Sequence, residues 1–593
     1  MHQSSTIDHV SAPSRLAAPR VTKGHFIMAV VVIALGYFLI WPVLLLLINS
    51  FNAANDWFVE PRRWGVAHWV NAFQRPGLLT SLGNSLMVWA LTVSISFPIG
   101  VSLAWLLART KIPFSHTLEF LFWISYMVPA LPTTIAWITL LDPDIGMINV
   151  ALKKLFSLDQ GPFNIFSVPG IVWANLMGHG ISIKVMLLTP AFRNMDSTLE
   201  EAARVGGASN LRTLFKITLP LMVSPMIMVL ALQLLRVFQS FETEYLLGMP
   251  FGFYVYSTKI YTLIRNQIPN YGEATVLASI TLLMIGLIIP LQRWILERRR
   301  YTTITGNFRP GLIDLRAWNY IAFGAIALLL ALLTVGPLAV LVLGSFMERI
   351  GYFVLGFTLE HWRLVLTDPV FVKALRTTLT LATTAALLSP LIFSVLAYIL
   401  VRTRLPGRSV LDLMIWSAGA IPGILAGLGL LWVFIGTPGL NFLFGTIWAL
   451  IIVVIVQGKT TGVNIMKGML VQVGADMEEA ARVSGAGWIR TYLRIWLPLL
   501  MPTLILLAVM NFVSAAGATS SIILLASRDT MTLSLMALEL SSSAISNREA
   551  ASILSIFIIL FTVTGASLVR YFGRRFGVRH EMHAPGGPAP TIY

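Results

Sequence analysis

Two polar segments carry the same charged residues at the same spacing. The first contains Glu200, Glu201, Ala202, Ala203, Arg204 and Val205, followed by Gly207 and later Pro220. The second contains Glu478, Glu479, Ala480, Ala481, Arg482 and Val483, followed by Gly485 and later Pro498. Residues 200–222 and 478–500 match at 14 of 23 positions without a gap, at an offset of 278. One repeat separated by nearly half the chain indicates gene duplication.

The local pattern of each segment predicts a short helix with a sharp end. Thr198 and Asp476 each stand three residues before a glutamate, which is the spacing of a capping box or its aspartate variant. The paired alanines favour a slim helix, and the following glycine can adopt the left-handed conformation that ends it. A basic stretch follows, and the proline is expected at the start of the next helix.

Such a helix, standing off a membrane, is suited to insertion into a groove on another protein. The alternative is an interfacial helix that lies on anionic lipid through its arginines. The same acids, alanines and glycine recur in one register in both copies, which favours the protein partner.

Other chemistry is poorly represented. The sequence has no phosphate-binding Gly-x-x-x-x-Gly-Lys-Ser/Thr loop, so the chain is not expected to bind or hydrolyse ATP unaided. It has no His-Glu-x-x-His motif and no cysteine, which excludes disulfides and thiolate chemistry. His179, between Gly178 and Gly180, is the one histidine well inside a predicted span. It is a candidate ligand-binding residue, although a lone membrane histidine is more often a packing group.

The remaining charged residues near the spans receive structural interpretations. Lys184, Lys459 and Lys467 are expected to snorkel to the cytoplasmic surface, and Glu119 and Asp412 to cap helices. Glu242 and Glu244 are expected in a solvated outer loop, with contact to a binding protein or a cation as the alternative.

Composition indicates a membrane protein. Of the 593 residues, 56% are hydrophobic and only 11% are charged, and the mean hydropathy is +0.79. Soluble domains carry about 25% charged residues. The net charge of +16 comes from basic residues beside apolar runs, so it sets topology and does not indicate a nucleic-acid partner.

The apolar runs predict an all-α polytopic membrane protein with about twelve spans. They lie near 26–50, 80–107, 117–141, 168–190, 218–238, 274–296, 317–346, 373–401, 410–435, 443–465, 498–523 and 549–571. The first run is too long for a signal peptide and is expected to be retained.

Basic residues follow every second span, whereas the alternate loops hold more acids. The positive-inside rule therefore places both termini and both repeated segments in the cytoplasm. Arg62, Arg63, Lys153 and Lys154 run against this rule without outweighing it.

The two halves match beyond the repeated segments. Residues 108–113 correspond to residues 401–406 in sequence. Trp123 and Pro129 likewise correspond to Trp416 and Pro422. Since each half has six spans, the copies enter the membrane in the same direction, which implies a pseudo-twofold axis along the membrane normal and a shared pathway. The predicted organisation is a tail (1–24), a first unit (25–296, coupling loop about 193–219), a linker (297–316), a second unit (317–575, coupling loop about 471–497) and a tail (576–593).

The pattern Glu-Ala-Ala, a glycine four residues on, and Ile-x-Leu-Pro at Ile217 and Ile495 resembles the signature loop of ABC importer permeases. The second copy has Ser484 where the first has Gly206. The likeness covers residues 25 to 575 as two fused six-span units of the type I importer kind. The Arg-Thr-x-x-Pro loops, Ser240-Phe241-Glu242 and the linker run Tyr301 to Gly306 look like the iron(III) importer group and its relatives for 2-aminoethylphosphonate, polyamines and thiamine.

The resemblance implies a transport subunit of the bacterial inner membrane that binds no cofactor. It implies two copies of a separate ATPase subunit, which bind ATP, and a periplasmic or lipid-anchored substrate-binding protein. Iron(III) is the expected cargo, with the relatives' cargoes as alternatives. The rival class is an ion-driven secondary transporter, which would need buried carboxylates as a relay, and a membrane-embedded enzyme would need convergent catalytic groups.

Overall fold

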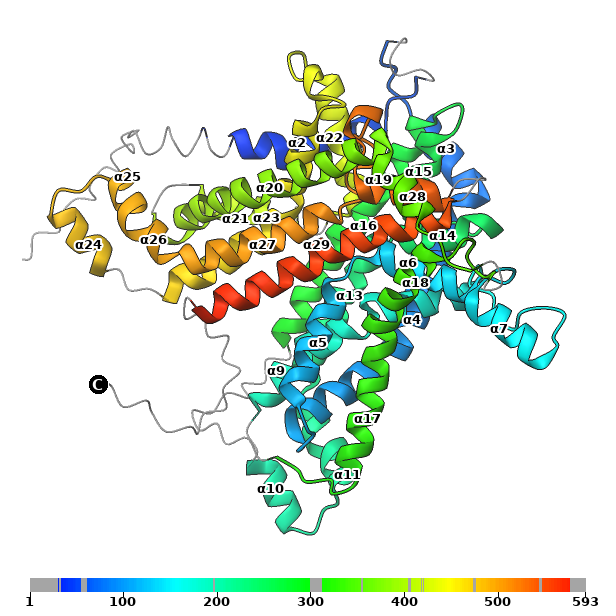
Figure 1. Ribbon diagram of the computed structural model, residues 1–593. Helices are drawn as coiled ribbons and strands as arrows, with labels where there is room; N and C mark the ends of the chain where they lie inside the picture. The colour runs from blue at the N-terminus through cyan, green and yellow to red at the C-terminus, as the bar shows by residue number, and fades with distance from the viewer. Residues whose placement is uncertain are drawn as a thin grey trace, which may run out of the picture.

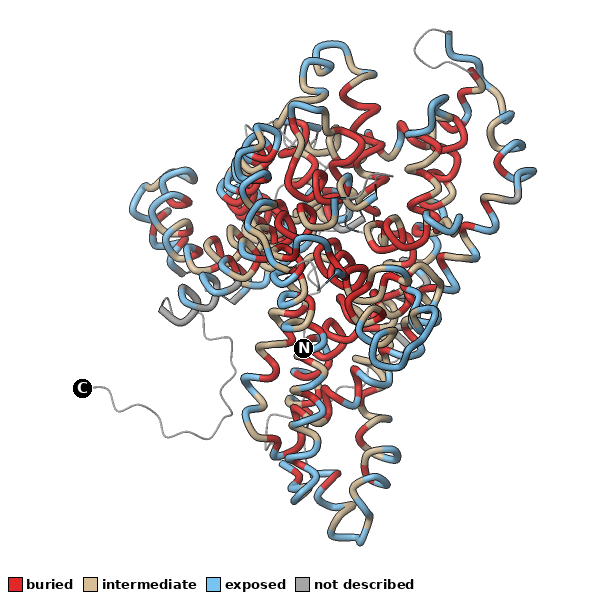
Figure 2. The backbone as a smooth tube through the Cα atoms, turned by 45° about the vertical axis from the view of Figure 1, so that its right-hand side comes forward, coloured by how far each residue is buried: buried red, intermediate tan, exposed pale blue. Residues whose placement is uncertain are grey.

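The computed structural model describes residues 30, 33–54, 61–195, 198–298, 312–352, 356–403, 407–417, 419, 421–472, 476–542 and 547–575. In this part of the chain the regular structure is helical, with three isolated β-bridges. Both predicted tails and most of the predicted linker lie outside the described residues. The described helices form two arms that diverge from a common region (Figures 1 and 2).

The first arm and the common region contain the helices of the first half of the chain. These are α2 (Trp41–Asn49), α3 (Ala67–Gln74), α4 (Pro76–Arg109), α5 (Ser115–Met127), α6 (Ala130–Leu141), α7 (Met147–Phe156), α8 (Val168–Asn175), the π-turn η1 (Leu176–Gly180), α9 (Ser182–Arg193), α10 (Thr198–Val205), α11 (Asn210–Thr213), η2 (Leu214–Thr218), α12 (Leu219–Leu221), α13 (Val223–Leu235), η3 (Arg236–Phe238), α14 (Glu242–Gly248), η4 (Met249–Phe251), α15 (Tyr256–Arg265) and α16 (Tyr271–Arg298).

The second half repeats this order. Its elements are α17 (Trp318–Leu330), η5 (Ala331–Val335), α18 (Gly336–Phe346), α19 (Glu360–Thr367), α20 (Pro369–Arg402), α21 (Arg408–Ser417), α22 (Gly423–Gly436), η8 (Asn441–Leu443), α23 (Ile447–Gln472), α24 (Asp476–Val483), α25 (Trp488–Thr491), η9 (Tyr492–Trp496), α26 (Leu497–Leu499), α27 (Met501–Ala516), η10 (Arg528–Thr530), α28 (Leu533–Ser542) and α29 (Arg548–Arg575). Helices α4 and α20 have equal lengths of 34 residues.

Several predicted spans are broken helices. Six described helices are long and apolar enough to cross a membrane, or up to ten if each bent pair counts as one span. The predicted span 117–141 is wrong as a single helix, because α5 and α6 meet at 93°. Pro129 stands at that break, where it cannot donate a backbone hydrogen bond.

The predicted span 498–523 is also too long, since α27 ends at Ala516. The next residue, Gly517, lies against Pro129 of the first unit, and an added Cβ would come within 2.8 Å of the proline ring. The helix therefore ends at a close contact between the two units.

The units exchange their first helices. In the first unit α2 packs on α22 of the second, and α18 of the second unit packs on α6 of the first. Further contacts between the units lie beside α5, where the rings of Phe114 and Phe323 are 6.1 Å apart, and at the end away from α10 and α24. There Arg265 Nη2 donates to the Ile523 carbonyl at 2.8 Å, and the rings of Tyr271 and Trp432 meet edge to face at 5.4 Å.

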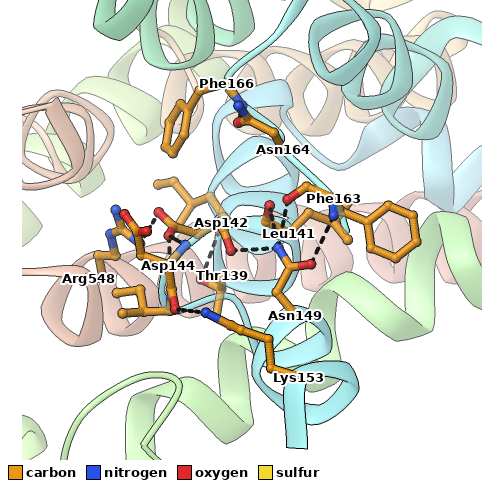
Figure 3. A network of polar contacts seen from close by, with 12 residues as sticks. Thr139, Leu141, Asp142, Asp144, Asn149, Lys153, Phe163, Asn164, Phe166 and Arg548 are labelled. Atoms are coloured by element: carbon orange, nitrogen blue, oxygen red, sulfur yellow. Dashed lines mark hydrogen bonds and ion pairs between the residues drawn. The ribbon is translucent and has the colours of Figure 1, made fainter. Parts of the chain in front are cut away.

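An ion pair between the half-buried Arg548 and the buried Asp142 joins the units at the end away from α10 and α24 (Figure 3). Arg548 Nη1, at the start of α29, lies 2.7 Å from Asp142 Oδ2, at the end of α6. The other oxygen of Asp142 accepts the backbone N–H groups of Asp144 and Ile145. Asn149 holds the following loop by donating to the Asp142 carbonyl at 2.8 Å. The ends of the two units away from α10 and α24 are thereby fastened together, and we call them the outer end, whereas the ends that carry α10 and α24 diverge.

Candidate functional site

The repeated segments form the tips of the two arms (Figure 1). Thr198 and Asp476 are the first described residues of helices α10 and α24, and both are helical. Residues 196–197 and 473–475 lie outside the described residues, so the capping of these helices stays a prediction.

The predicted left-handed glycines are confirmed. Gly207 has φ +80° and Gly485 has φ +75°. In the first copy the Gly207 N–H donates to the Arg204 carbonyl and the Ala208 N–H to the Ala203 carbonyl, at 3.0 and 2.9 Å. These two bonds form a Schellman motif, which satisfies carbonyls at the helix end. The second copy repeats the longer-range bond from Ala486 to Ala481, at 2.9 Å.

The two prolines do not start the long helices that follow the tips, as the sequence predicts, but lie in short helices just before them. Pro220 and Pro498 belong to the three-residue helices α12 and α26, each preceded by a π-turn. The long helices α13 and α27 begin only after bends of 65° and 73°. Each tip therefore joins the membrane part through a bent helical connection.

Glu200 is an anchor and not part of the exposed surface. Its carboxylate is fully buried and forms an ion pair with the guanidinium of Arg109, which is also fully buried, at the end of α4. Its other oxygen accepts the Thr218 hydroxyl at 2.5 Å, and Arg109 Nη1 donates to the Met195 carbonyl at 3.2 Å. These bonds tie α10 to α4 and to the turn that leads into α13.

The second tip has an anchor of different composition. Glu478 is buried and its Oε1 accepts the hydroxyl of Tyr398 at 2.9 Å. Arg402, the counterpart of Arg109, donates to the Leu470 carbonyl at 2.6 Å and lies 4.8 Å from the centroid of the Trp496 ring.

The exposed surface of each tip is apolar with a basic border. Glu201, Ala202, Gly207 and Pro220 are exposed in the first copy, as are Glu479, Ala480, Gly485 and Pro498 in the second, whereas Ala203 and Arg204 are half-buried and Ala481 is buried. The side chain of Arg482 lies outside the described residues. Val205 and Val483 are each 90% exposed.

Four large apolar residues are exposed at each tip, and they correspond one to one. They are Leu199, Val205, Leu211 and Phe215 in the first copy, and Met477, Val483, Ile489 and Leu493 in the second. We name these two sets the docking surfaces. Exposed Arg212, Lys216, Arg490 and Arg494 lie beside them, and a hollow of about 610 Å³ is lined by Ile489, Leu493 and the two arginines of the second copy. Of these residues only Val205 and Val483 were identified in the repeated segments from the sequence, although the same offset of 278 pairs the others as well.

A polar cavity of about 280 Å³ lies inside the first unit. It is lined by parts of α4, α8, η1, α13 and α14, and His179 is among its residues. The His179 ring meets Tyr126 edge to face at 5.4 Å. Short π-helical segments such as η1 are frequent at functional sites.

The predicted snorkelling of Lys184 and Lys459 is wrong, because both are buried. Lys184 Nζ lies in the cavity wall and donates to Ser96 Oγ and to the Gly180 carbonyl, both at 2.7 Å. Lys459 Nζ donates to the Val456 carbonyl at 2.7 Å.

Lys467, Glu119 and Asp412 form ion pairs, and the partly exposed side chain of Lys467 leaves its predicted snorkelling open. Lys467 pairs with Asp412 at 2.6 Å, and Glu119 pairs with Arg193 at 2.7 Å.

The predicted solvated loop at Glu242 and Glu244 is also wrong. Helix α14 folds back against α8 and α6. Glu244 is consequently fully buried, and its Oε1 accepts Asn175 Nδ2 at 2.9 Å. Glu242 lines the cavity and its Oε1 accepts the backbone N–H of Ser520 at 3.2 Å.

The family model described as "Binding-protein-dependent transport system inner membrane component" matches residues 96–301 and 391–578. These two matches, one in each half, cover most of the chain. The protein belongs to this family. It is thus an ABC-type permease, a membrane transport subunit built from two fused units.

Individual relatives of this permease are distant. It is 24% identical to a ferric transport system permease protein, FbpB, of Actinobacillus pleuropneumoniae, over 84% of this chain and 71% of that protein. It is 25% identical to the sn-glycerol-3-phosphate transport system permease protein UgpA of Yersinia pestis, over 44% of this chain and 90% of that one. A chain from the crystal structure of a bacterial alginate ABC transporter, in complex with an alginate-bound periplasmic protein, aligns with a TM-score of 0.40 and 20% identity, covering 47% of this chain and 96% of that one.

Proposed function

We propose that this permease forms the substrate pathway of an ATP-driven importer and couples it to two copies of a separate ATPase subunit through the docking surfaces. The observation that carries the proposal is the one-to-one match of exposed apolar residues at the two tips. Apolar side chains left in water on a duplicated surface fit a partner that is itself present twice. ATP is bound by those subunits, and this chain contributes neither an ATPase site nor a cofactor.

The proposed orientation places α10, α24 and both termini in the cytoplasm of a bacterium. A periplasmic or lipid-anchored binding protein would then meet the outer end, where the units are fastened together. The divergent tips and closed outer end support an inward-facing arrangement for this state. Approach of the tips on ATP binding would rotate the two units as bodies and open the outer end.

Two cargo classes are proposed. Iron(III) comes first, because the ferric relative aligns over most of both chains. An aminoalkylphosphonate, exemplified by 2-aminoethylphosphonate, comes second, because the first unit contains a cavity with both basic and acidic side chains. Polyamine and thiamine remain alternatives from the sequence resemblance alone.

Association with the ATPase subunit tests the proposal. Leu211→Glu and Ile489→Glu each place a charge on one docking surface and should weaken association about tenfold or more, as expected for an interface anchor. Leu155→Glu is the matched control, because Leu155 is 74% exposed on α7, at the outer end. The purified chain alone should not hydrolyse ATP. Unchanged association of both variants, or hydrolysis by the pure chain, would refute the proposal.

A further inference from the structure

The cavity of the first unit contains buried polar atoms that the protein leaves unsatisfied. Gln233 Nε2 and Thr92 Oγ1 lack hydrogen-bond partners within the described residues, whereas Glu244 Oε2 lies beside the Ser240 side chain, which can donate to it. All three residues line the cavity. Since buried polar groups are normally hydrogen-bonded, two such atoms in the wall of one cavity mark it as a site that can bind a polar ligand.

The cavity also keeps its opposite charges apart. Arg236 and Lys184 line it together with Glu242 and Glu244. Among the ion pairs of the described residues, none joins either of these cations to either of these acids. A buried charge without a counter-charge is costly, so a ligand that carries both charges would stabilise the site at both ends.

Each end still has hydrogen-bonding capacity. Arg236 donates from Nη2 to the Tyr126 hydroxyl at 3.4 Å, which leaves other N–H groups of its five for an anion. Lys184 uses two of its three donors on Ser96 and Gly180. At the acidic end, Glu244 Oε2 can accept from an amine.

The second unit does not reproduce this set of residues. At the offset of 278, Asn175, Arg236 and Glu244 correspond to Val453, Ser514 and Ile522. Helix α27 packs along α20 in the second unit, whereas its counterpart α13 packs on α9 and α16. The charged cavity is therefore a property of one unit and not a by-product of the duplicated fold.

The cavity adjoins the pseudo-twofold axis. Glu242 and Ser520 are counterparts at the offset of 278, and they hydrogen-bond to each other. A residue that contacts its own symmetry counterpart lies on the axis. A ligand in the cavity consequently borders the shared pathway that the duplication predicts.

We infer that this cavity binds a small zwitterion, with its acidic group at Arg236 and Lys184 and its amine at Glu244 and Glu242. The inference rests on the proposed importer function, and it selects the second of the two cargo classes. The volume of about 280 Å³ suits a molecule of a few heavy atoms. Bare iron(III) fits poorly, because Arg236 and Lys184 repel a cation. Within the described residues no group of three or more metal-binding side chains is found.

Binding to the full chain in lipid nanodiscs tests the inference by calorimetry. The probes are 2-aminoethylphosphonate, ethylphosphonate and ethylamine, which carry both charges, the acid alone and the amine alone. The zwitterion should bind about tenfold or more tightly than either one-ended probe, because each end adds a charge-assisted hydrogen bond. Arg236→Gln should remove its advantage over ethylamine, and Glu244→Gln its advantage over ethylphosphonate.

A steric variant tests the site without removing a charge. An added Cβ at Gly178, which lines the cavity, meets no atom within 4 Å. Gly178→Leu should therefore fill the cavity and abolish binding of the zwitterion. Gly286→Leu is the matched control, since Gly286 is an exposed helical glycine in α16 with equally open surroundings.

Three results would overturn the inference: no binding by the native chain, equal affinity for all three probes, or unchanged binding by Gly178→Leu. Tighter binding of iron(III) nitrilotriacetate than of the zwitterion at this cavity would overturn it as well. Association of Gly178→Leu with the ATPase subunit should stay normal. Failure of the native chain to associate would refute the importer function instead, so the two failures are distinguishable.

Discussion

Replacing Arg109 with glutamine should loosen α10 from the end of α4. In the native protein the guanidinium of Arg109 and the carboxylate of Glu200 are both fully buried and paired. Glutamine keeps much of the volume and one donor but removes the charge. Glu200 is then left as a buried carboxylate whose remaining partner in this site is the Thr218 hydroxyl.

Breaking a buried ion pair by removing one partner costs about 3–5 kcal/mol. Because 1.4 kcal/mol corresponds to a factor of ten, opening of α10 should become more frequent by about two to three and a half orders of magnitude. The change can be no larger than the stability of α10 itself, since a fully open helix has no protection left to lose.

Hydrogen exchange of peptides that cover residues 198–208 measures this opening. The Arg109→Gln protein should exchange faster there, while peptides from α24 keep their native rates. Lys111→Gln is the control, because Lys111 pairs with Asp314 at 3.5 Å and both side chains are more than half exposed. Exposed pairs contribute little, so this variant should leave α10 unchanged. Native exchange in α10 of Arg109→Gln would show that the buried pair does not hold the tip.

Three further outcomes follow from the tips and the outer end. Gly207→Val and Gly485→Val should each strain a left-handed backbone by about 1–2 kcal/mol. ATPase association should fall while the membrane helices still insert, and normal transport by both variants would contradict the docking role. Labels at Ser209 and Gly487 should approach each other in an ATP-trapped complex, as pulsed electron resonance can measure in this cysteine-free chain; an unchanged separation would rule out rotation of the units. Asp142→Asn removes an ion pair at the outer end, so cross-linking between α6 and α29 should become less efficient.

Sequence alone determined the class of this protein and the form of its tips. Long hydrophobic runs specify membrane helices, because a segment that crosses a bilayer needs apolar side chains and must satisfy its backbone hydrogen bonds internally. The duplication is visible as a constant offset. The glycine ends of α10 and α24 were predictable too, because a left-handed residue is a local backbone requirement, met at Gly207 and Gly485.

Only the tertiary structure decided which charged residues are buried and what they contact. From the sequence, Glu200 is expected to be an exposed acid of the docking segment. In the structure it is buried against Arg109, which lies 91 residues earlier in the chain. Lys184 and Glu244 were assigned to the surface, yet Ser96 and Asn175 hold them inside the first unit. These contacts join distant parts of the chain, so they depend on how broken helices fold back. Hydropathy reports the average environment of a segment and cannot show the direction of one side chain.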